Sequence, residues 1–156
     1  MRTTRVHGQR GAAAVEFAIV LLPLVLILFG IVEFSLIMYD KAQITNASRE
    51  GARFGAAFHP DPRPTCQEIF TAAIAPYQQG LVTFGGTTTI APTCRTRAYD
   101  AATGTWSAWG TGVCAEPNDQ IAVDTSFTYT FLVFPKIAQN FLGALTLTST
   151  TVMRCE

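Results

Sequence analysis

Charged side chains are scarce in this sequence, and it contains no basic run. Only 14% of the 156 residues are charged, and the formal net charge is zero. Three arginines lie among the first ten residues without an acidic neighbour, so loss of residues 1–11 would leave 8 basic against 11 acidic residues. A weakly acidic product of this kind argues against nucleic acid as a partner.

The sequence also has little of what enzymes use for catalysis. Its two histidines are His7, in the basic leader, and His59, which stands beside prolines and is interpreted as solvated. Asp119 and Asp124 are interpreted as a turn acid and an edge-strand acid, because nothing suggests a shared site. Without a nucleophile and base, a carboxylate pair or a metal-ligand cluster, we expect no enzyme, no catalytic residue, no metal or other cofactor and no small-molecule substrate.

The longest apolar run lies between Glu16 and Glu33, where sixteen consecutive residues are uncharged. As one helix, residues 12–38 would be about 40 Å long, enough to cross a hydrocarbon core of about 30 Å. The basic leader predicts a cytoplasmic N-terminus by the positive-inside rule. A cleavable secretory signal is the competing interpretation, but no small-residue cleavage site follows the run. We therefore predict that the helix stays on the mature protein as a single-pass anchor.

The helical pattern continues beyond this run and then stops at a proline-rich segment. An apolar stripe recurs with steps of seven, three and four, and residues 59–64 end it with three prolines. Gly51 and Gly55 mark either a close backbone approach or a fraying end. Thr65 and Glu68 form a capping box that starts a second helix, from Cys66 to about Tyr77. The stripe consists of Ile37, Ile44, Ala47, Gly51, Phe54 and Phe58.

Beyond Gly80 the apolar period changes to two, which predicts strands. Residues 95–99 and 105–109 flank a turn and form a predicted hairpin, in which Trp106 and Trp109 face opposite sides. One tryptophan is then expected in the core, and the other is a candidate contact residue. The fold class is α+β: a long N-terminal transmembrane and amphipathic helix, a short second helix and an antiparallel sheet. The other predicted strands are residues 81–84, 87–91, 121–134 and 145–153.

All four cysteines, Cys66, Cys94, Cys114 and Cys155, follow the apolar segment, and none has a C-x-x-C spacing. An even number in a small exported domain favours disulfides, with three connectivities open, whereas a cytosolic protein would keep them as buried thiols. Because Cys94 and Cys114 bracket the predicted hairpin, we prefer that pair, which leaves Cys66 for Cys155.

The residues from Gly11 to Phe17, GAAAVEF, resemble the type IV pilin signature. In that signature a prepilin peptidase cuts after a glycine, and a glutamate is the fifth residue of the mature chain. Together with the segment 46–53 (NASREGAR) and the closing segment 145–154 (LTLTSTTVMR), the sequence is similar to the TadE family of pseudopilins from the tight-adherence (Flp) pilus system.

The resemblance implies a structural subunit that assembles into an adhesive pilus of a biofilm-forming bacterium. It implies cleavage between Gly11 and Ala12, and an assembly role for Glu16 and Phe17. The expected partners are the membrane, the prepilin peptidase, other pilin subunits and the assembly platform. The chain would lie in the bacterial inner membrane with its C-terminal domain in the periplasm or outside the cell. The expected division is a leader at 1–11, a helix at 12–58 and an α+β domain at 59–156.

Glu16 carries the physical side of this interpretation. A carboxylate within the bilayer costs at least about 2 to 3 kcal/mol, so it is retained there only with a partner or near the interface. Cleavage would give Ala12 an amino group one helical turn away, which could pair with Glu16 of a neighbouring subunit. The simpler alternative places Glu16 in the headgroup zone. A second functional hypothesis is an anchored extracytoplasmic domain that binds a partner through Trp106 or Trp109 without assembling.

Overall fold

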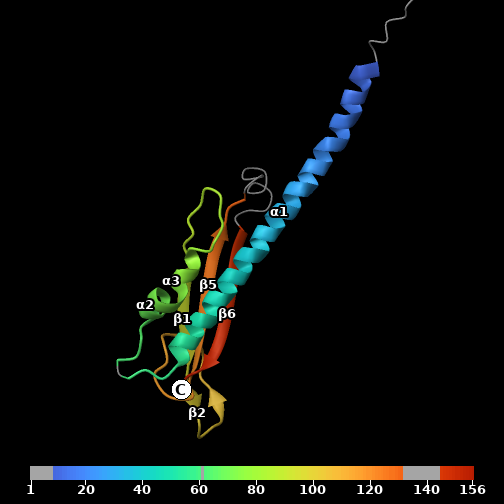
Figure 1. Ribbon diagram of the computed structural model, residues 1–156. Coiled ribbons are helices and arrows are strands. Elements are labelled where there is room, and N and C mark those ends of the chain that lie inside the picture. Colours follow the sequence, from blue (N-terminus) through green and yellow to red (C-terminus); the bar gives the residue numbers. More distant parts are fainter. Residues whose placement is uncertain (1–8, 61, 132–144) are drawn as a thin grey trace, which may run out of the picture. The chain divides into compact units, whose positions relative to one another are not determined.

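The computed structural model describes residues 9–60, 62–131 and 145–156, which fall into two compact units, the first ending at Ser35 and the second beginning at Leu36. The long N-terminal helix, the short second helical segment and the antiparallel sheet confirm the predicted α+β class (Figure 1). In chain order the helical elements are α1 (Gln9–Ala56), α2 (Cys66–Ile69), the π-helical turn η1 (Phe70–Ile74) and α3 (Ala75–Gln78). The strands are β1 (Ala91–Arg97), β2 (Tyr99–Asp100), β3 (Thr105–Trp106), β4 (Gly110–Thr111), β5 (Gln120–Tyr129) and β6 (Leu145–Arg154).

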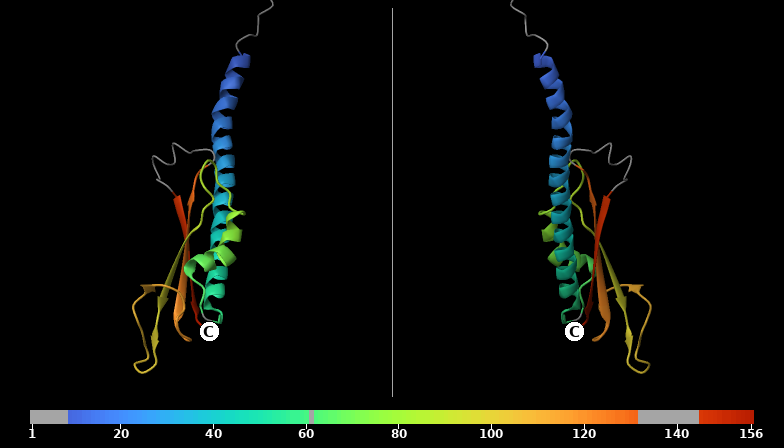
Figure 2. Two further views of the ribbon diagram at one scale, coloured as in Figure 1. Left: turned by 90° about the vertical axis from the view of Figure 1, so that its left-hand side faces the viewer. Right: turned by 90° about the vertical axis from the view of Figure 1, so that its right-hand side faces the viewer.

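The second unit is a sheet with helices on one face. The strands are antiparallel in the order β4-β1-β5-β6, and β2 and β3 form a separate hairpin. Residues 36–56 of α1 lie on the same side of the sheet as α2 and α3 (Figure 2). The core between the layers holds side chains from α1, η1 and β5, including Ile44, Ile74 and Phe127. Among the described residues, no helix lies on the opposite face of the sheet.

Two glycines let α1 approach this core closely. A Cβ on Gly51 would lie 2.9 Å from the Ile74 side chain, and one on Gly55 would lie 2.8 Å from both Ile69 and Ile121. Both positions are buried, so the glycines mark a close backbone approach rather than a fraying helix end. Their cost to helix stability, about 1 kcal/mol each relative to alanine, is therefore offset by packing. The apolar stripe stops short of Phe58, which follows the end of α1 and is 70% exposed.

Two buried hydroxyls connect α1 to the middle of the sheet. Ser48 Oγ donates to the Val123 carbonyl (2.8 Å) and lies 2.9 Å from Thr151 Oγ1. Thr125 Oγ1 donates to the Ile44 carbonyl of α1 (3.0 Å). Both side chains are buried, and a buried hydroxyl is tolerated when it is hydrogen-bonded. These bonds fix the position of α1 along β5.

The second helical segment begins as the sequence predicts. Glu68 accepts from the Thr65 amide (2.7 Å), and the Thr65 hydroxyl accepts from the Glu68 amide (3.3 Å), which confirms the capping box. The segment then widens into the π-helical turn η1 before Pro76, near the start of α3. Proline has no N–H to donate to the preceding turn, and a π-helical turn accommodates such a missing bond.

Residues 81–90 do not form the predicted strands. No strand is present in residues 81–90, and the apolar alternation in this stretch belongs to a loop. Side chains from elsewhere satisfy two of its amides: Asp40 Oδ1 accepts from Val82 N (2.9 Å), and Gln78 Oε1 accepts from Ile90 N (3.0 Å). Gly85, with φ at +83°, turns the backbone between them. A chain whose amides are bonded in this way needs no neighbouring strand.

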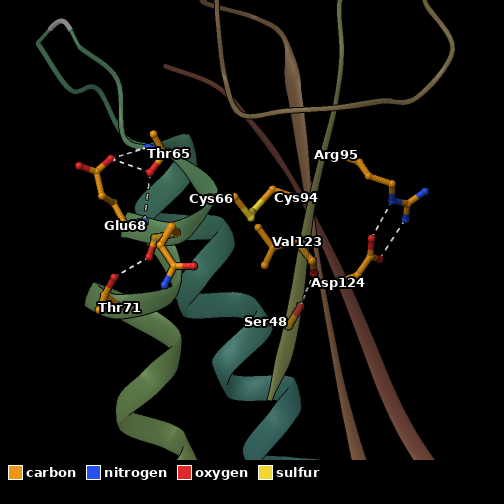
Figure 3. Close-up of a disulfide and its surroundings, with 10 residues drawn as sticks. Ser48, Thr65, Cys66, Glu68, Thr71, Cys94, Arg95, Val123 and Asp124 are labelled. Carbon is orange, nitrogen blue, oxygen red and sulfur yellow. Dashed lines mark hydrogen bonds and ion pairs between the residues drawn. A yellow bond between two sulfur atoms is a disulfide. The ribbon is translucent and has the colours of Figure 1, made fainter. Parts of the chain in front are cut away.

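All four cysteines form disulfides, but the preferred pairing was wrong. The structure joins Cys66 to Cys94 and Cys114 to Cys155. The Gly112 amide donates to the Cys94 carbonyl, so Gly112 is the residue opposite Cys94. Cys114 lies two residues further along the chain and is therefore not the cross-strand neighbour of Cys94. Cys94 is buried, and Figure 3 shows it bonded to Cys66 at the start of α2. The hairpin itself, with Tyr99 opposite Trp106, is confirmed.

Candidate functional site

The first compact unit contains an apolar stretch of α1 whose side chains are exposed all round. Exposed side chains follow one another through every turn, from Val15 (60%) and Phe17 (64%) to Ile31 (61%). A helix that is apolar on all sides requires an apolar surrounding, and α1 is long and apolar enough to cross a membrane. One such helix fits a single-pass membrane anchor. Pro23 lies within it, and membrane helices tolerate a single proline.

The four residues of the predicted cleavage and assembly sites lie near the start of this stretch. Gly11, Ala12, Glu16 and Phe17 are all helical and exposed, and Glu16 is the fourth residue after Ala12, about one turn of the helix further along. Glu16 makes no ion pair with the side chains that the structure describes. The region therefore presents one carboxylate at the edge of a long apolar surface.

The outer face of the sheet carries a second group of side chains, around Trp106 and Trp109. The two tryptophans do not face opposite sides, and neither is buried in the core; both are half-buried and contact the same side chain, Arg97. The prediction failed because the strand β3 ends at Trp106, so strand alternation does not extend to Trp109.

Cations and aromatic rings contact one another in a continuous series along this group. The Arg97 guanidinium carbon lies 4.9 Å from the ring centre of Trp106 and 4.6 Å from that of Trp109. The Tyr99 and Trp106 ring centres are 4.8 Å apart. The ends are formed by Arg95, 5.5 Å from the Trp109 ring centre, and Arg154, 6.0 Å from that of Tyr99. We call this set the ladder; in order of contact it consists of Arg154, Tyr99, Trp106, Arg97, Trp109 and Arg95.

Hydrogen bonds hold two arginines of the ladder to β5. Arg95 donates to both carboxylate oxygens of Asp124 (2.7 and 2.9 Å), as Figure 3 shows, whereas Arg97 donates to the neutral Oε1 of Gln120 (2.8 and 2.6 Å). The bonds from Arg95 hold the pKa of Asp124 below its ordinary value, against an opposing effect of burial. The charge of Arg95 is therefore compensated by a carboxylate, and that of Arg97 is not.

The sequence pointed to the two tryptophans but missed the three arginines of the ladder. A usable signal was present, because Arg95 and Arg97 are two residues apart on a strand and so share a face. Arg154 could not be placed beside them without the register of β6. In that register Arg154 lies opposite Gln120, and Gln120 lies opposite Arg97.

The remaining polar candidates have separate structural roles. The ring of His59 lies against that of Phe54, and its Nε2 is 2.9 Å from the Phe54 carbonyl. Asp119 accepts from the amides of Tyr99 and Glu116 (3.3 Å each) and shares no site with Asp124. In the part of the chain that the structure describes, no cluster of histidine, cysteine and acidic side chains could hold a metal ion. His7 lies outside the described residues.

Comparison with known proteins finds a match for the N-terminal part of the chain. The model of the family described as TadE-like protein matches residues 11–53. No curated protein and no solved structure matches the chain. The match runs from Gly11, at the predicted cleavage junction, through the apolar stretch to the helix that packs on the sheet. Over these residues the resemblance to the TadE-like family is confirmed.

Proposed function

We propose that the chain is a minor pilin or pseudopilin, a non-enzymatic structural subunit of a tight-adherence pilus. The TadE-like match suggests a pilus-associated, pilin-like protein, and that family is generally structural. The observation that carries the proposal is Glu16, an exposed carboxylate without an ion-pair partner among the described side chains, at the edge of an apolar helix. Subunit assembly gives that carboxylate a partner that a lone anchor lacks.

In this proposal the prepilin peptidase cuts between Gly11 and Ala12. Both residues lie within α1, which begins at Gln9, so the helix must open there before the bond is cut. Glycine is about 1 kcal/mol less favourable than alanine in a helix, and a Cβ on Gly11 would meet no atom within 4 Å. Packing therefore does not explain this glycine, whereas local opening of the helix does.

After cleavage, the new amino group of Ala12 pairs with Glu16 of a neighbouring subunit. The two residues are one turn apart in a single chain, so a small axial shift between two parallel helices brings one amine to the other carboxylate. Phe17 and the apolar side chains that follow pack between the subunits. The α+β domain faces the periplasm or the filament exterior, and the assembled pilus serves surface adhesion and biofilm formation.

The first test is the intact mass of the protein extracted from membranes of its own host. We expect a mass that lacks residues 1–11, and the full-length mass in a Gly11→Leu variant, which blocks the peptidase. A full-length mass for the wild-type protein in a host with an active peptidase would overturn the proposal. It would instead favour an anchored domain that binds without assembling.

The second test removes the charge of Glu16. Glu16→Val and the isosteric Glu16→Gln should both insert into the membrane and accumulate normally, but should not support pilus assembly, measured by counting pili. The matched control is Glu50→Gln, which removes a carboxylate from the other half of the same helix and should leave piliation unchanged. Normal piliation in both Glu16 variants would favour the simpler alternative, in which Glu16 lies in the headgroup zone and has no role in assembly.

A further inference from the structure

The ladder forms one end of an exposed polar surface on the outer face of the sheet. In the register of the strands, Arg97, Gln120 and Arg154 form one row across β1, β5 and β6. Four residues further along each strand, Thr93, Asp124 and Thr150 form another row on the same face, and hydroxyl side chains continue from there. Residues directly opposite each other in a sheet share a face, so all these side chains lie on one surface. The continuing hydroxyl residues are Ser126, Thr128, Thr146 and Thr148.

This surface has an excess of positive charge at its ladder end. Asp124 compensates Arg95, but Arg97 and Arg154 form no ion pair within the described part of the chain. The neighbouring Asp119 is buried, and its carboxylate is used by backbone amides. Gln120, between the two arginines in the row, is neutral. The guanidinium groups of Arg97 and Arg154 thus flank the side-chain amide of Gln120. A carboxylate at that position would compensate the charge of both arginines.

The aromatic rings of the ladder are already engaged within the chain. Each indole lies beneath a guanidinium, and Trp106 also contacts Tyr99. Ring faces used in this way are not free to stack on the apolar face of a neutral sugar. The guanidinium of Arg97 uses two of its five N–H donors on Gln120, and Arg154 is exposed. The groups left for a ligand are therefore charged donors, which suit carboxylates.

The rest of the surface indicates what carries those carboxylates. Protein–protein interfaces are centred on buried apolar or aromatic anchors. Beside the ladder, this face offers one exposed apolar side chain, Val152, among exposed threonines and a half-buried serine. A hydroxyl group both donates and accepts hydrogen bonds, which matches the hydroxyl groups of a sugar. A flat face with guanidinium groups at one end and hydroxyl groups along its strands is complementary to a polymer that carries both carboxylates and hydroxyls.

We propose that the outer face of the sheet, from the ladder to the hydroxyl rows of β5 and β6, binds a carboxylate-bearing polysaccharide. Arg97 and Arg154 bind the carboxylates, and the threonine and serine side chains bind the hydroxyl groups. The ladder aligns Arg97 between two rings, so little side-chain freedom is lost on binding. This proposal does not depend on cleavage after Gly11 or on pilus assembly, and its test is separate from theirs.

The test measures binding of sodium alginate, a polymer of carboxylate sugars, to the full-length protein in a polyoxyethylene detergent. We expect binding that weakens as salt is raised. The deciding variant is Gln120→Glu, which places a carboxylate between Arg97 and Arg154 and gives them an internal partner. It should keep the fold and lower the affinity about tenfold, the size of one lost charged hydrogen bond. Arg154→Gln should lower it by a similar factor.

The matched control is Arg53→Gln. Arg53 lies on α1, away from the outer face, with its side chain 72% exposed, and the substitution changes the net charge by the same amount as the two test variants. It should leave the affinity within about twofold of the wild-type value, because exposed charges distant from a site are screened. If Gln120→Glu does not fold, as judged by circular dichroism, Arg154→Gln decides the question alone.

Four outcomes would overturn the proposal. The first is no binding of alginate by the wild-type protein. The second is equal loss of affinity in Arg53→Gln and Arg154→Gln, which would reduce the effect to net charge. The third is binding of poly-glutamate as tight as that of alginate, which would assign the surface to an acidic protein. The fourth concerns neutral dextran, which should not bind. Binding of dextran as tight as that of alginate would show that the surface does not recognise carboxylates.

Discussion

Residues 11–35 and residues 36–56 belong to the same helix, yet their side chains have different surroundings. In the first stretch, large apolar side chains are exposed on every side, as Leu22 (68%) and Leu24 (60%) illustrate. In the second, Ile44 and Ala47 are buried against the sheet, and Asn46 between them is exposed. Helix propensity is therefore not what distinguishes them. The difference lies in the solvent each stretch needs, lipid for the first and a protein core for the second.

The glycines show the same contrast at the level of single atoms. A Cβ on Gly30 would meet nothing within 4 Å, whereas one on Gly55 would lie 2.8 Å from two buried isoleucines. The same residue type is thus open to substitution in the first stretch and required by packing in the second. Substitutions in the two stretches should accordingly affect different properties, insertion in one case and folding in the other.

The largest expected effect is confined to the second unit. Replacing Cys114 and Cys155 by alanine opens a loop with a sequence separation of 41 residues, which should lower the free energy of unfolding by about 4 kcal/mol. Urea unfolding of the full chain in detergent, followed by tryptophan fluorescence, measures this. Membrane extraction with carbonate should show normal insertion. An unchanged urea midpoint would contradict the role assigned to this disulfide.

The next effect is confined to the first unit. Leu24→Arg places a charge near the middle of the apolar stretch, which should disfavour insertion by about 2.5 to 3.5 kcal/mol. Carbonate extraction should release more of this variant than of the wild-type protein, while the unfolding midpoint of the domain stays the same. Asn46→Arg, at an exposed position of the second stretch, is the control and should change neither property. Insertion of Leu24→Arg at the wild-type level would argue against a membrane span.

A smaller effect compares two glycines directly. Gly55→Val would force apart the buried Ile69 and Ile121, so it should lower the free energy of unfolding by about 1 to 3 kcal/mol despite the better helix propensity of valine. Gly30→Val, in the open stretch, should leave unfolding unchanged. The comparison is read from the urea midpoints of the two variants, and equal midpoints would show that α1 does not pack through Gly55.

The smallest effect concerns pH. The pKa of Asp124 lies below its ordinary value of 3.8 because the Arg95 guanidinium donates to the charged carboxylate. The stabilisation is therefore present above pH 3.8 and is lost as the pH falls through the lowered pKa. Asp124→Asn should remove this part of the acid dependence, worth about 1 kcal/mol or less for a partly exposed pair. Identical pH profiles of unfolding for the variant and the wild-type protein, between pH 6 and 2, would contradict the assignment.

The parts of the fold that could be predicted depend on neighbours in sequence. The capping box of Thr65 and Glu68 needs four consecutive residues, and the alternation of Ile121, Val123 and Phe127 needs one strand; both are present in the structure. The position of α1 and the approximate extent of β6 were likewise visible in local patterns. The TadE-like segment lies in this well-predicted part.

The parts that could not be predicted depend on partners far away in the chain. The loop at residues 81–90 alternates like a strand, but Asp40, more than forty residues earlier, binds one of its amides. The disulfide pairing depends on how β4 leaves β1, which no local pattern records. The ladder requires three strands in register. The cleavage and assembly residues near Glu16 stay predictions, because their partners would be other molecules.

The Cys114–Cys155 disulfide has a mechanical consequence. The covalent ring that it closes contains all of β5 and β6. A tensile force applied between α1 and Cys155 therefore passes across the disulfide instead of peeling β6 from β5. The ring withholds about 140 Å of chain that would otherwise extend under tension, at about 3.5 Å per residue. The domain can stretch elsewhere under load, while its two longest strands keep their pairing.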